Sequence, residues 1–311
     1  MRVVSVIGTR PQFIKAAIMD AELVRRGHHH AVVDTGQHYD SAMRVGFGIT
    51  PDVVTHDIVP QLAGHDMVLC YGDTDSTVEA CRAAIRAGLM LVHLESGCRS
   101  FDQSMPEERN RIIADRLADL RLVPTPNCAM NLAAEGLSSV VTGDVMLDAF
   151  LADPVPRAAS DYVLVTIHRQ QNTDDPARLR QIAASVKALG LPVVWPRHHR
   201  TAAAAVSASI DIPFSPAVPA DEMRRLLMEC AFVVTDSGGL MREAYFGGVP
   251  CVTVRDTLEF PETLDGGWNT LVEPDGIAAP GTPTGPLGHA FGYGDAAARA
   301  VDSMEARWRT E

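Results

Sequence analysis

Polar side chains that could do acid–base chemistry follow the short apolar runs of this 311-residue sequence. Asp73 and Glu95 each end such a run, Glu107 opens an amphipathic stretch, and His168 directly follows a later run. Ligands of open α/β sheets bind outside the carboxyl ends of the strands, so these groups should meet at one site. Carboxylates there could move a proton at a sugar carbon, and a histidine could contact phosphate or act as a general acid.

Each of these residues also has a structural alternative. The carboxylates could cap helices or balance helix dipoles, and this role competes strongly for Glu107. His168 could be a hydrogen-bonded residue at the end of a strand. The functional interpretation depends on how many such segments there are. Polar, glycine-containing segments follow nearly every apolar run, and helix capping alone does not readily explain so many at one site.

The segment Asp236-Ser237-Gly238-Gly239 precedes a predicted helix and forms a candidate anion cradle. Free N–H groups at a helix N-terminus and a small hydroxyl suit a diphosphate. Arg10 could neutralise a phosphate, and Glu243, one turn into the helix, could reach a ribose diol. A simple N-cap by Asp236 or Ser237 is an equal alternative, and Arg10 could be a surface residue. The absence of G-x-x-x-x-G-K-[ST] and G-x-G-x-x-G motifs weighs against a P-loop NTPase and an ordinary dinucleotide enzyme.

Two series of apolar runs and amphipathic stretches must position these residues. The first series predicts strands at 3–7, 31–33, 67–71, 89–94, 121–123 and 139–141, and helices at 11–26, 76–87 and 106–120. After a proline-rich linker at 153–160, the second predicts strands at 162–167, 192–195, 210–214, 231–235 and 249–254, and helices at 177–189, 220–230, 239–246 and 295–308. Short apolar runs are typical of buried parallel strands. We therefore predict an α/β protein with two Rossmann-like, doubly wound parallel-sheet domains that face a cleft.

Composition limits the classes of partner. Lys and Arg number 27 against 39 Asp and Glu, a net charge of −12, which disfavours nucleic acid. No apolar run reaches the roughly 18 residues of a membrane span, so no membrane partner is expected. The six cysteines form no C-x-x-C motif and predict buried thiols in a reducing compartment, hence a soluble cytoplasmic protein. No His or Cys spacing matches a metal site, and no metal is expected.

Taken in order, these motifs resemble those of the UDP-N-acetylglucosamine 2-epimerase family, of which this would be an unusually short, non-hydrolysing bacterial type. Each motif alone is weakly specific, but together they follow the family's order from residue 8 to about residue 272. They comprise Gly8-Thr9-Arg10-Pro11, Thr35-Gly36-Gln37-His38-Tyr39-Asp40, Gly72-Asp73-Thr74, His93-Leu94-Glu95-Ser96-Gly97-Cys98-Arg99-Ser100, Pro106-Glu107-Glu108-Arg109-Asn110-Arg111, Thr142-Gly143-Asp144-Val145, His168-Arg169, His198 with Arg200-Thr201, Thr235-Asp236-Ser237-Gly238-Gly239, Arg255-Asp256-Thr257 and Pro261-Glu262.

The resemblance implies a glycosyltransferase B fold. Its N-terminal Rossmann-like domain would span 1–153 and its UDP-binding Rossmann-like domain 160–290. A C-terminal helix, 291–311, would pack back on the first domain. The resemblance also implies a UDP-sugar substrate, no cofactor, and a homodimer.

The resemblance implies a reaction as well. UDP-N-acetylglucosamine and UDP-N-acetylmannosamine would interconvert at C2, through elimination of UDP to a glycal-like intermediate and re-addition of UDP. Asp73, Glu95 and Glu107 would be the acid–base carboxylates, with the residue that removes the C2 proton left open, and His168 would assist the departing UDP. The implied substrate-binding residues are Arg10, Arg99, Arg111, His198, Arg200, Ser237, Gly238, Gly239, Glu243, Arg255 and Asp256.

Several departures from the family pattern bear on the substrate. Gln12 replaces a usual Glu, Ser96 and Cys98 replace Ala and Leu beside Glu95, and Gln171 replaces a Glu after His168. None removes a catalytic candidate. Three other functions stay open: a hydrolysing 2-epimerase that releases N-acetylmannosamine and UDP, a glycosyltransferase, and a non-catalytic nucleotide-sugar sensor.

The segment 43–64 is shorter than in typical family members. In many bacterial members a loop in this region, with the Gln-His that matches Gln37-His38, forms a second UDP-N-acetylglucosamine site that activates the enzyme. We therefore expect this activation to be weak or absent here. Initial rates against substrate alone should be hyperbolic, and strong sigmoidality that an added activator removes would contradict the hypothesis.

Overall fold

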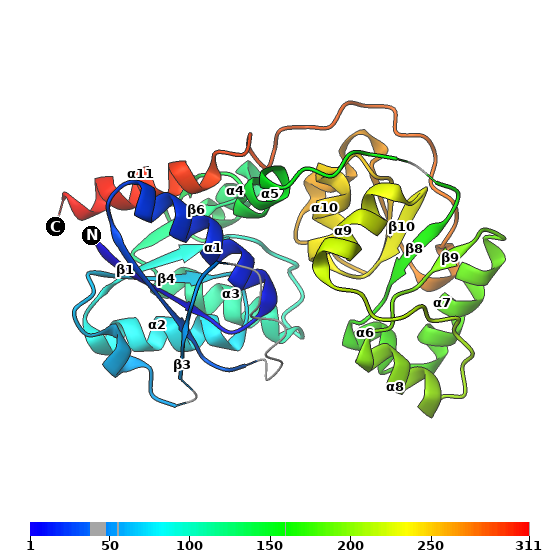
Figure 1. Cartoon of the computed structure of the whole chain (residues 1–311), viewed down its shortest axis with the longest axis horizontal. Helices are drawn as coiled ribbons and strands as arrows, with labels where there is room; N and C mark the ends of the chain where they lie inside the picture. Colours follow the sequence, from blue (N-terminus) through cyan, green and yellow to red (C-terminus); the bar gives the residue numbers. More distant parts are fainter. Residues whose placement is uncertain (38–47, 55, 159, 311) are drawn as a thin grey trace. The chain divides into compact units, whose positions relative to one another are not determined.

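Two parallel β-sheets organise the chain, one in each of two compact units (Figure 1). The computed structural model describes residues 1–37, 48–54, 56–158 and 160–310. Unit 1 comprises Met1–Ala152 with His289–Glu311, and unit 2 comprises Asp153–Gly288. His38, and residues 43–47 and 55 of the shortened segment, lie outside the described residues.

Unit 1 holds a sheet in the order β3-β2-β1-β4-β5-β6-β7. Strand order reverses between β1 and β4, so the segments after these two neighbouring strands lie at the switch point of a doubly wound sheet. The strands are β1 (Arg2–Ile7), β2 (His29–Asp34), β3 (Asp52–Val53), β4 (Met67–Tyr71), β5 (Met90–Leu94), β6 (Leu120–Val123) and β7 (Val140–Val141). The helices are α1 (Arg10–Arg25), η2 (Val59–Leu62), α2 (Asp75–Ala87), α3 (Pro106–Leu117), α4 (Pro126–Ala134), α5 (Val145–Ala152) and α11 (Ala296–Trp308).

Local sequence signals fix the helix starts at this sheet edge. Thr9 and Gln12 form a reciprocal capping box at the start of α1. Thr74 and Thr77 form a similar arrangement at the start of α2, and the Thr125 side chain caps α4. These starts come directly after strands, so strand ends and helix N-termini share one edge of the sheet.

Both faces of the unit 1 sheet are buried. Alternate residues of β1 point to opposite sides: Val3 and Ile7 join the core under α1, α5 and α11, whereas Val4 and Val6 join the core under α2 and α3. Strands that are apolar on both faces read as continuous apolar runs, which is why the sequence alone predicted them.

Helix α11 completes the first of these two cores. It lies along α1 in unit 1 (Figure 1), and Ala300, Val301 and Met304 are fully buried there. The Asp148 carboxylate accepts the backbone N–H groups of Ala296 and Ala297 at 3.1 and 2.8 Å, which anchors the start of the helix. The last helix is thus a structural part of unit 1.

Unit 2 holds a sheet in the order β12-β11-β10-β8-β9, with its switch point between β8 and β10. The strands are β8 (Val163–Thr166), β9 (Val193–Val194), β10 (Phe232–Thr235), β11 (Cys251–Val254) and β12 (Asn269–Val272). The helices are α6 (Gln170–Thr173), α7 (Pro176–Ala188), α8 (His199–Ser207), α9 (Ala220–Glu229), α10 (Gly238–Phe246), η3 (Pro261–Gly267) and η4 (Pro274–Gly276). None of the described helices is long and apolar enough to cross a membrane.

The strand predicted at 210–214 is wrong. This segment is irregular, and it is followed by a single bridge between Pro196 and Ser215. Pro213 has no N–H group for a ladder, so the run packs Ile212 into the core without forming a strand. The sequence analysis also missed β12, α4, α5 and α8, whose apolar or alanine-rich runs are short.

The packing of α11 generates a stability prediction. Replacing the fully buried Met304 by Ala leaves a cavity in the core of unit 1 and should cost about 2–5 kcal/mol of unfolding free energy. Ser303→Ala on the same helix should change stability by less than about 0.5 kcal/mol. Urea denaturation, with hydrogen exchange to identify the amides of unit 1, measures both variants. Equal effects of the two substitutions would contradict the assigned packing.

Candidate active site

A buried ion pair marks the end of β5 in unit 1. The Lys15 ammonium, from α1, contacts the Glu95 carboxylate, and their side chains are only 5% and 14% exposed. Glu95 has a φ of 67°, a left-handed conformation that is uncommon outside glycine. The Lys15 ammonium also lies beside Gly72, because a Cβ atom at Gly72 would be 4.0 Å from Nζ. Lys15 therefore connects the strand ends that carry Asp73 and Glu95.

The sequence analysis missed Lys15. Its signal was present, because Gln12, Phe13, Ala16 and Met19 around it form the buried side of α1, and a lysine on such a side needs a partner. The sequence gives no means of identifying that partner, which lies 80 residues away.

A buried polar network fixes the turn after β5, which contains Glu95. The Asp115 carboxylate, from α3, accepts hydrogen bonds from His93 Nδ1 at 2.7 Å and from the Gly97 N–H at 3.1 Å. The Ser96 hydroxyl also donates to Asp115. Burial opposes the charge on Asp115, but the hydrogen bond and positive charge of His93, with Arg99, outweigh it and lower the Asp115 pKa. Burial likewise opposes protonation of His93, but Asp115 raises the His93 pKa overall.

Arg99 belongs to this network. Its side chain is 1% exposed, with Nη1 2.7 Å from Asp115 and Nε 2.8 Å from Glu135. We predicted that Arg99 binds substrate, but the structure encloses its guanidinium within unit 1. Asp115 and Glu135 form ion pairs with the Arg99 guanidinium, to which the sequence analysis had assigned a ligand.

A second series of charged side chains, separate from the Asp115 network, holds Asp73. Arg111 of α3 contacts the Asp73 carboxylate with one nitrogen and the buried Glu108 carboxylate with another, the latter at 2.9 Å. The Asp73 side chain is 30% exposed, so it can still meet a ligand. Arg111, predicted to bind substrate, is thus bound to two carboxylates. Glu107 is exposed in the first turn of α3, where it also suits the helix dipole.

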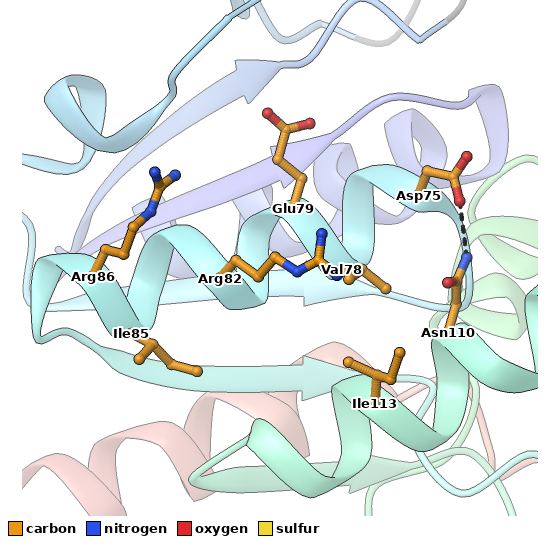
Figure 2. A pocket seen from close by; sticks show the side chains of 8 residues that line it. All are labelled: Asp75, Val78, Glu79, Arg82, Ile85, Arg86, Asn110 and Ile113. Carbon is orange, nitrogen blue, oxygen red and sulfur yellow. Dashed lines mark hydrogen bonds between the residues drawn. The ribbon is translucent and has the colours of Figure 1, made fainter.

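Asn110 ties α3 to the same turn. Its Nδ2 donates to the Asp73 carbonyl at 3.0 Å and to Asp75 Oδ1 at 3.1 Å, the contact drawn in Figure 2. The hollow in that view lies along α2 and α3. None of the predicted site residues lines it; its lining residues are Asp75, Val78, Glu79, Arg82, Ile85, Arg86, Asn110 and Ile113.

The exit of β1 is joined to the exit of β4 by Gln12. Its Oε1 accepts the Gly8 N–H at 2.8 Å, and its Nε2 donates to the Tyr71 carbonyl at 2.8 Å. Arg10, the first residue of α1, is half-buried beside this junction. The amide of Gln12 both donates and accepts here, so the glutamine that departs from the family's usual glutamate fits its surroundings.

In unit 2, Asp236 anchors the loop that carries His168. Its fully buried carboxylate accepts the N–H groups of His168 at 3.0 Å and Arg169 at 2.8 Å, and the Asn172 amide at 3.0 Å. Ser237, not Asp236, caps α10, since the Leu240 N–H donates to Ser237 Oγ at 3.3 Å. The N-cap that the sequence analysis gave as one alternative is therefore present at Ser237, and the anion cradle stays a prediction.

The N-terminus of α10 lies beside two arginines and the carboxylate that pairs with them. A Cβ atom at Gly238 would lie 3.7 Å from the Arg255 guanidinium, 3.8 Å from that of Arg169 and 3.9 Å from the Glu259 carboxylate. The first N–H groups of a helix have no partner within the helix, so Ser237, Gly238 and Gly239 can present donors to an anion. Glu243 is half-buried one turn further along α10.

Three predicted substrate ligands in unit 2 already have protein partners. Arg255 is buried and bonds to both carboxylate oxygens of Glu259, at 2.6 and 2.7 Å. Asp256 lies 3.2 Å from Arg178, and Arg200 lies 2.7 Å from Asp174. Arg255 is therefore enclosed by its partner, whereas Arg200 and Asp256 lie in partly exposed ion pairs and their contact with a ligand stays a prediction.

A cluster of histidines lies after β8 and β9. The His168 and His198 rings are 5.0 Å apart, and those of His198 and His199 are 4.3 Å apart. Burial is the main cause that lowers the pKa of His168, against the opposing charge of Asp236. Burial and repulsion from the other two histidines lower the pKa of His198 to about 4. Both imidazoles are therefore neutral near pH 7.

Within the residues that the structure describes, no group of three or more His, Cys, Asp or Glu side chains could hold a metal ion. The arrangement offers carboxylates and an ammonium in unit 1, and a helix N-terminus with a neutral histidine in unit 2. Such groups suit proton transfer at a carbon and stabilisation of a departing phosphate.

The histidine cluster predicts an acid-sensitive unit 2. The folded-state pKa of His198 lies below the value of about 6.5 in an unfolded chain, so the unfolded chain binds more protons between about pH 4 and 6.5. Stability should therefore fall as pH falls through this window. Urea denaturation from pH 7.5 to 4 should show a smaller loss for His198→Gln than for the wild type or a His289→Gln control. Identical pH slopes for all three proteins would contradict this assignment.

Comparisons with known proteins agree with the geometry. The family model for UDP-N-acetylglucosamine 2-epimerase matches residues 21–304. A Pseudomonas aeruginosa UDP-2,3-diacetamido-2,3-dideoxy-D-glucuronate 2-epimerase is 36% identical over 88% of both chains. The crystal structure of a Methanocaldococcus jannaschii UDP-GlcNAc 2-epimerase in complex with UDP-GlcNAc and UDP is 25% identical, has a TM-score of 0.86, and matches 98% of this chain and 100% of that one. A Staphylococcus aureus protein solved with UDP is 26% identical with a TM-score of 0.82, over 100% of this chain and 98% of that one. The fold is the glycosyltransferase B type, and the chain belongs to the UDP-N-acetylglucosamine 2-epimerase family.

Proposed function

We propose that this protein interconverts UDP-N-acetylglucosamine and UDP-N-acetylmannosamine without hydrolysis and without an acceptor. The observation that carries the proposal is the pair of balanced carboxylates, Glu95 with Lys15 and Asp73 with Arg111, at neighbouring strand ends of unit 1. In a member of this family, such carboxylates would exchange the proton at C2 of the sugar.

The proposed reaction has two halves that use the same groups. A carboxylate accepts the C2 proton while the C1–O bond breaks, its electrons leave with UDP, and a C1–C2 double bond forms. A proton is then delivered to the other face of C2, and UDP re-adds at C1. Asp73, Glu95 and Glu107 are the candidates for these transfers. Lys15 lies beside Glu95 and balances the negative charge of that carboxylate.

Unit 2 supplies the groups proposed to bind UDP. The helix N-terminus at Ser237, Gly238 and Gly239 would hold the diphosphate, with Glu243 at the ribose. His168, neutral and held through its backbone by Asp236, would donate a hydrogen bond to the departing phosphate oxygen. His198 would add a contact to the UDP group, as would Arg10 of unit 1. Arg200 and Asp256 stay candidates for such a contact. The other predicted ligands would act through the protein partners described above; these are Arg99, Arg111 and Arg255.

A second substrate is favoured by one specific observation. The 36% identical relative carries the name UDP-2,3-diacetamido-2,3-dideoxy-D-glucuronate 2-epimerase. That sugar has the same acetamido group at C2, and so the same proton chemistry applies to it. It differs by a second acetamido group at C3 and a carboxylate at C5. Both nucleotide sugars should therefore be tested.

Proton NMR of the purified protein with each nucleotide sugar in D₂O tests the proposal. A C2 epimer that carries deuterium at C2, formed without an acceptor, is the expected product. Free N-acetylmannosamine with UDP would identify a hydrolysing enzyme instead. Binding of UDP without exchange or product from either sugar would leave a transferase or a sensor. Light scattering would test the homodimer that the family favours.

Substitutions at the site give a matched prediction. Asp73→Asn, Glu95→Gln and His168→Ala should each lower kcat by on the order of 10²-fold or more, as for a lost acid–base group. Lys15→Met should lower kcat because it leaves the Glu95 charge unbalanced, and Lys15→Arg should retain more activity. Glu22→Gln, the same change at an equally enclosed glutamate that pairs with Arg25 and Arg26 at the other end of α1, is the control and should be near normal. Near-normal turnover in Asp73→Asn, Glu95→Gln and His168→Ala would disprove the assignment.

A further inference from the structure

Phe101 is a strained and exposed aromatic residue at the carboxyl-end edge of unit 1. Its side chain is 75% exposed, and its backbone has a φ of 60°. A bulky residue in the left-handed region is an outlier that the surrounding structure must enforce. Single exposed apolar side chains are common, but burial in the core cannot explain why this one is held in a strained conformation.

The buried Glu108 carboxylate enforces this conformation. It accepts the Phe101 N–H at 3.0 Å and the Ser100 N–H at 2.9 Å, and only 1% of its side chain is exposed. The carboxylate is at once the hydrogen-bond acceptor for the loop and the partner of Arg111. A charged acceptor makes such bonds strong, so the loop is held rigidly.

The same network reaches the proposed acid–base group. Arg111 joins Glu108 to Asp73, so one chain of contacts links the Phe101 backbone to the Asp73 carboxylate. The Phe101 backbone is thus fixed relative to a proposed proton-transfer group, and its exposed phenyl ring is free to meet a substrate that binds beside Asp73.

We propose that Phe101 is a specificity-determining residue that contacts the acetamido methyl group at C2 of the sugar. This inference rests on the proposed function. In that proposal, C2 of the sugar lies at Asp73 and Glu95 of unit 1. The acetamido methyl is then the one methyl group of the substrate attached near the reacting carbon. An exposed phenyl ring gains by covering it, because both apolar surfaces leave water.

This contact defines a substrate class. It favours nucleotide sugars with an acetamido group at C2 over those with a hydroxyl group there. Burial of one methyl group is worth roughly fourfold in affinity, from about 0.8 kcal/mol per buried carbon group and 1.4 kcal/mol per factor of ten.

Calorimetric binding of UDP-N-acetylglucosamine, UDP-glucose and UDP tests the contact. Phe101→Ala should weaken UDP-N-acetylglucosamine by about fourfold or more, with little change for UDP-glucose and UDP. Phe101→Leu, which keeps an apolar side chain, should lie between the wild type and Phe101→Ala. Val206→Ala, at a 78% exposed position on α8 in unit 2, is the matched control and should bind all three ligands normally.

Phe101→Gly separates ligand contact from backbone strain. Glycine adopts the left-handed conformation readily, so the thermal midpoint should be unchanged or higher while the loss of affinity persists. Unaltered binding of UDP-N-acetylglucosamine in Phe101→Ala and Phe101→Gly, or an equal loss for all three ligands, would overturn the proposal. These measurements need no turnover. Failure of the epimerisation assay with intact selective binding would therefore reject the proposed reaction and leave the contact standing.

Discussion

The edge of unit 1 that carries the proposed acid–base residues depends on one buried group, the Asp115 carboxylate. A charge removed from water is tolerated only when hydrogen bonds and opposite charges surround it. Asp115 meets this condition with His93, Ser96, Arg99 and the Gly97 N–H. The same bonds fix the turn after β5 and so present Glu95 in its left-handed conformation. Satisfying one buried charge and shaping the site are thus a single arrangement.

A buried carboxylate also binds the backbone of a loop at two other places in the molecule. Glu108 accepts N–H groups of the 100–101 loop, and Asp236 accepts those of the His168 loop. In all three cases a buried carboxylate binds backbone N–H groups of a loop, and that loop carries a residue of the proposed site, namely Glu95, Phe101 or His168. Rigid loops of this kind hold reactive groups in place before a ligand arrives, which is a large part of catalytic power.

The fold was largely predictable from the sequence, and the site only in part. Buried parallel strands such as Met67–Tyr71 and Met90–Leu94 are continuous apolar runs. One helix follows the capping residue Thr74 and another begins with Pro106, so local signals were enough. The segment 210–214 looked equally apolar, but it forms no strand, because Pro213 lacks an N–H group and none of the described strands pairs with it. Local sequence holds no information on which distant strand is available to pair.

The charged residues show the same limit more sharply. Asp73, Glu95 and His168 were identified because they follow strands, which is a local property. Whether Arg99 or Arg255 meets a ligand or a carboxylate depends on residues such as Asp115 and Glu259, whose positions only the fold defines. Lys15 escaped notice for this reason: its role is evident only once Glu95 is known to lie beside it.

The order of the two units along the chain has a consequence for synthesis. Unit 1 needs Ala296, Val301 and Met304 for its core, whereas every residue of unit 2 lies between the two parts of unit 1. On the ribosome, all of unit 2 is therefore translated before the helix that closes unit 1. Until that helix emerges, Phe13, Ala16 and Leu23 on α1 lack part of their cover, and the nascent chain exposes apolar surface that invites chaperones or aggregation. The half of the molecule that is begun first is thus the half that is finished last.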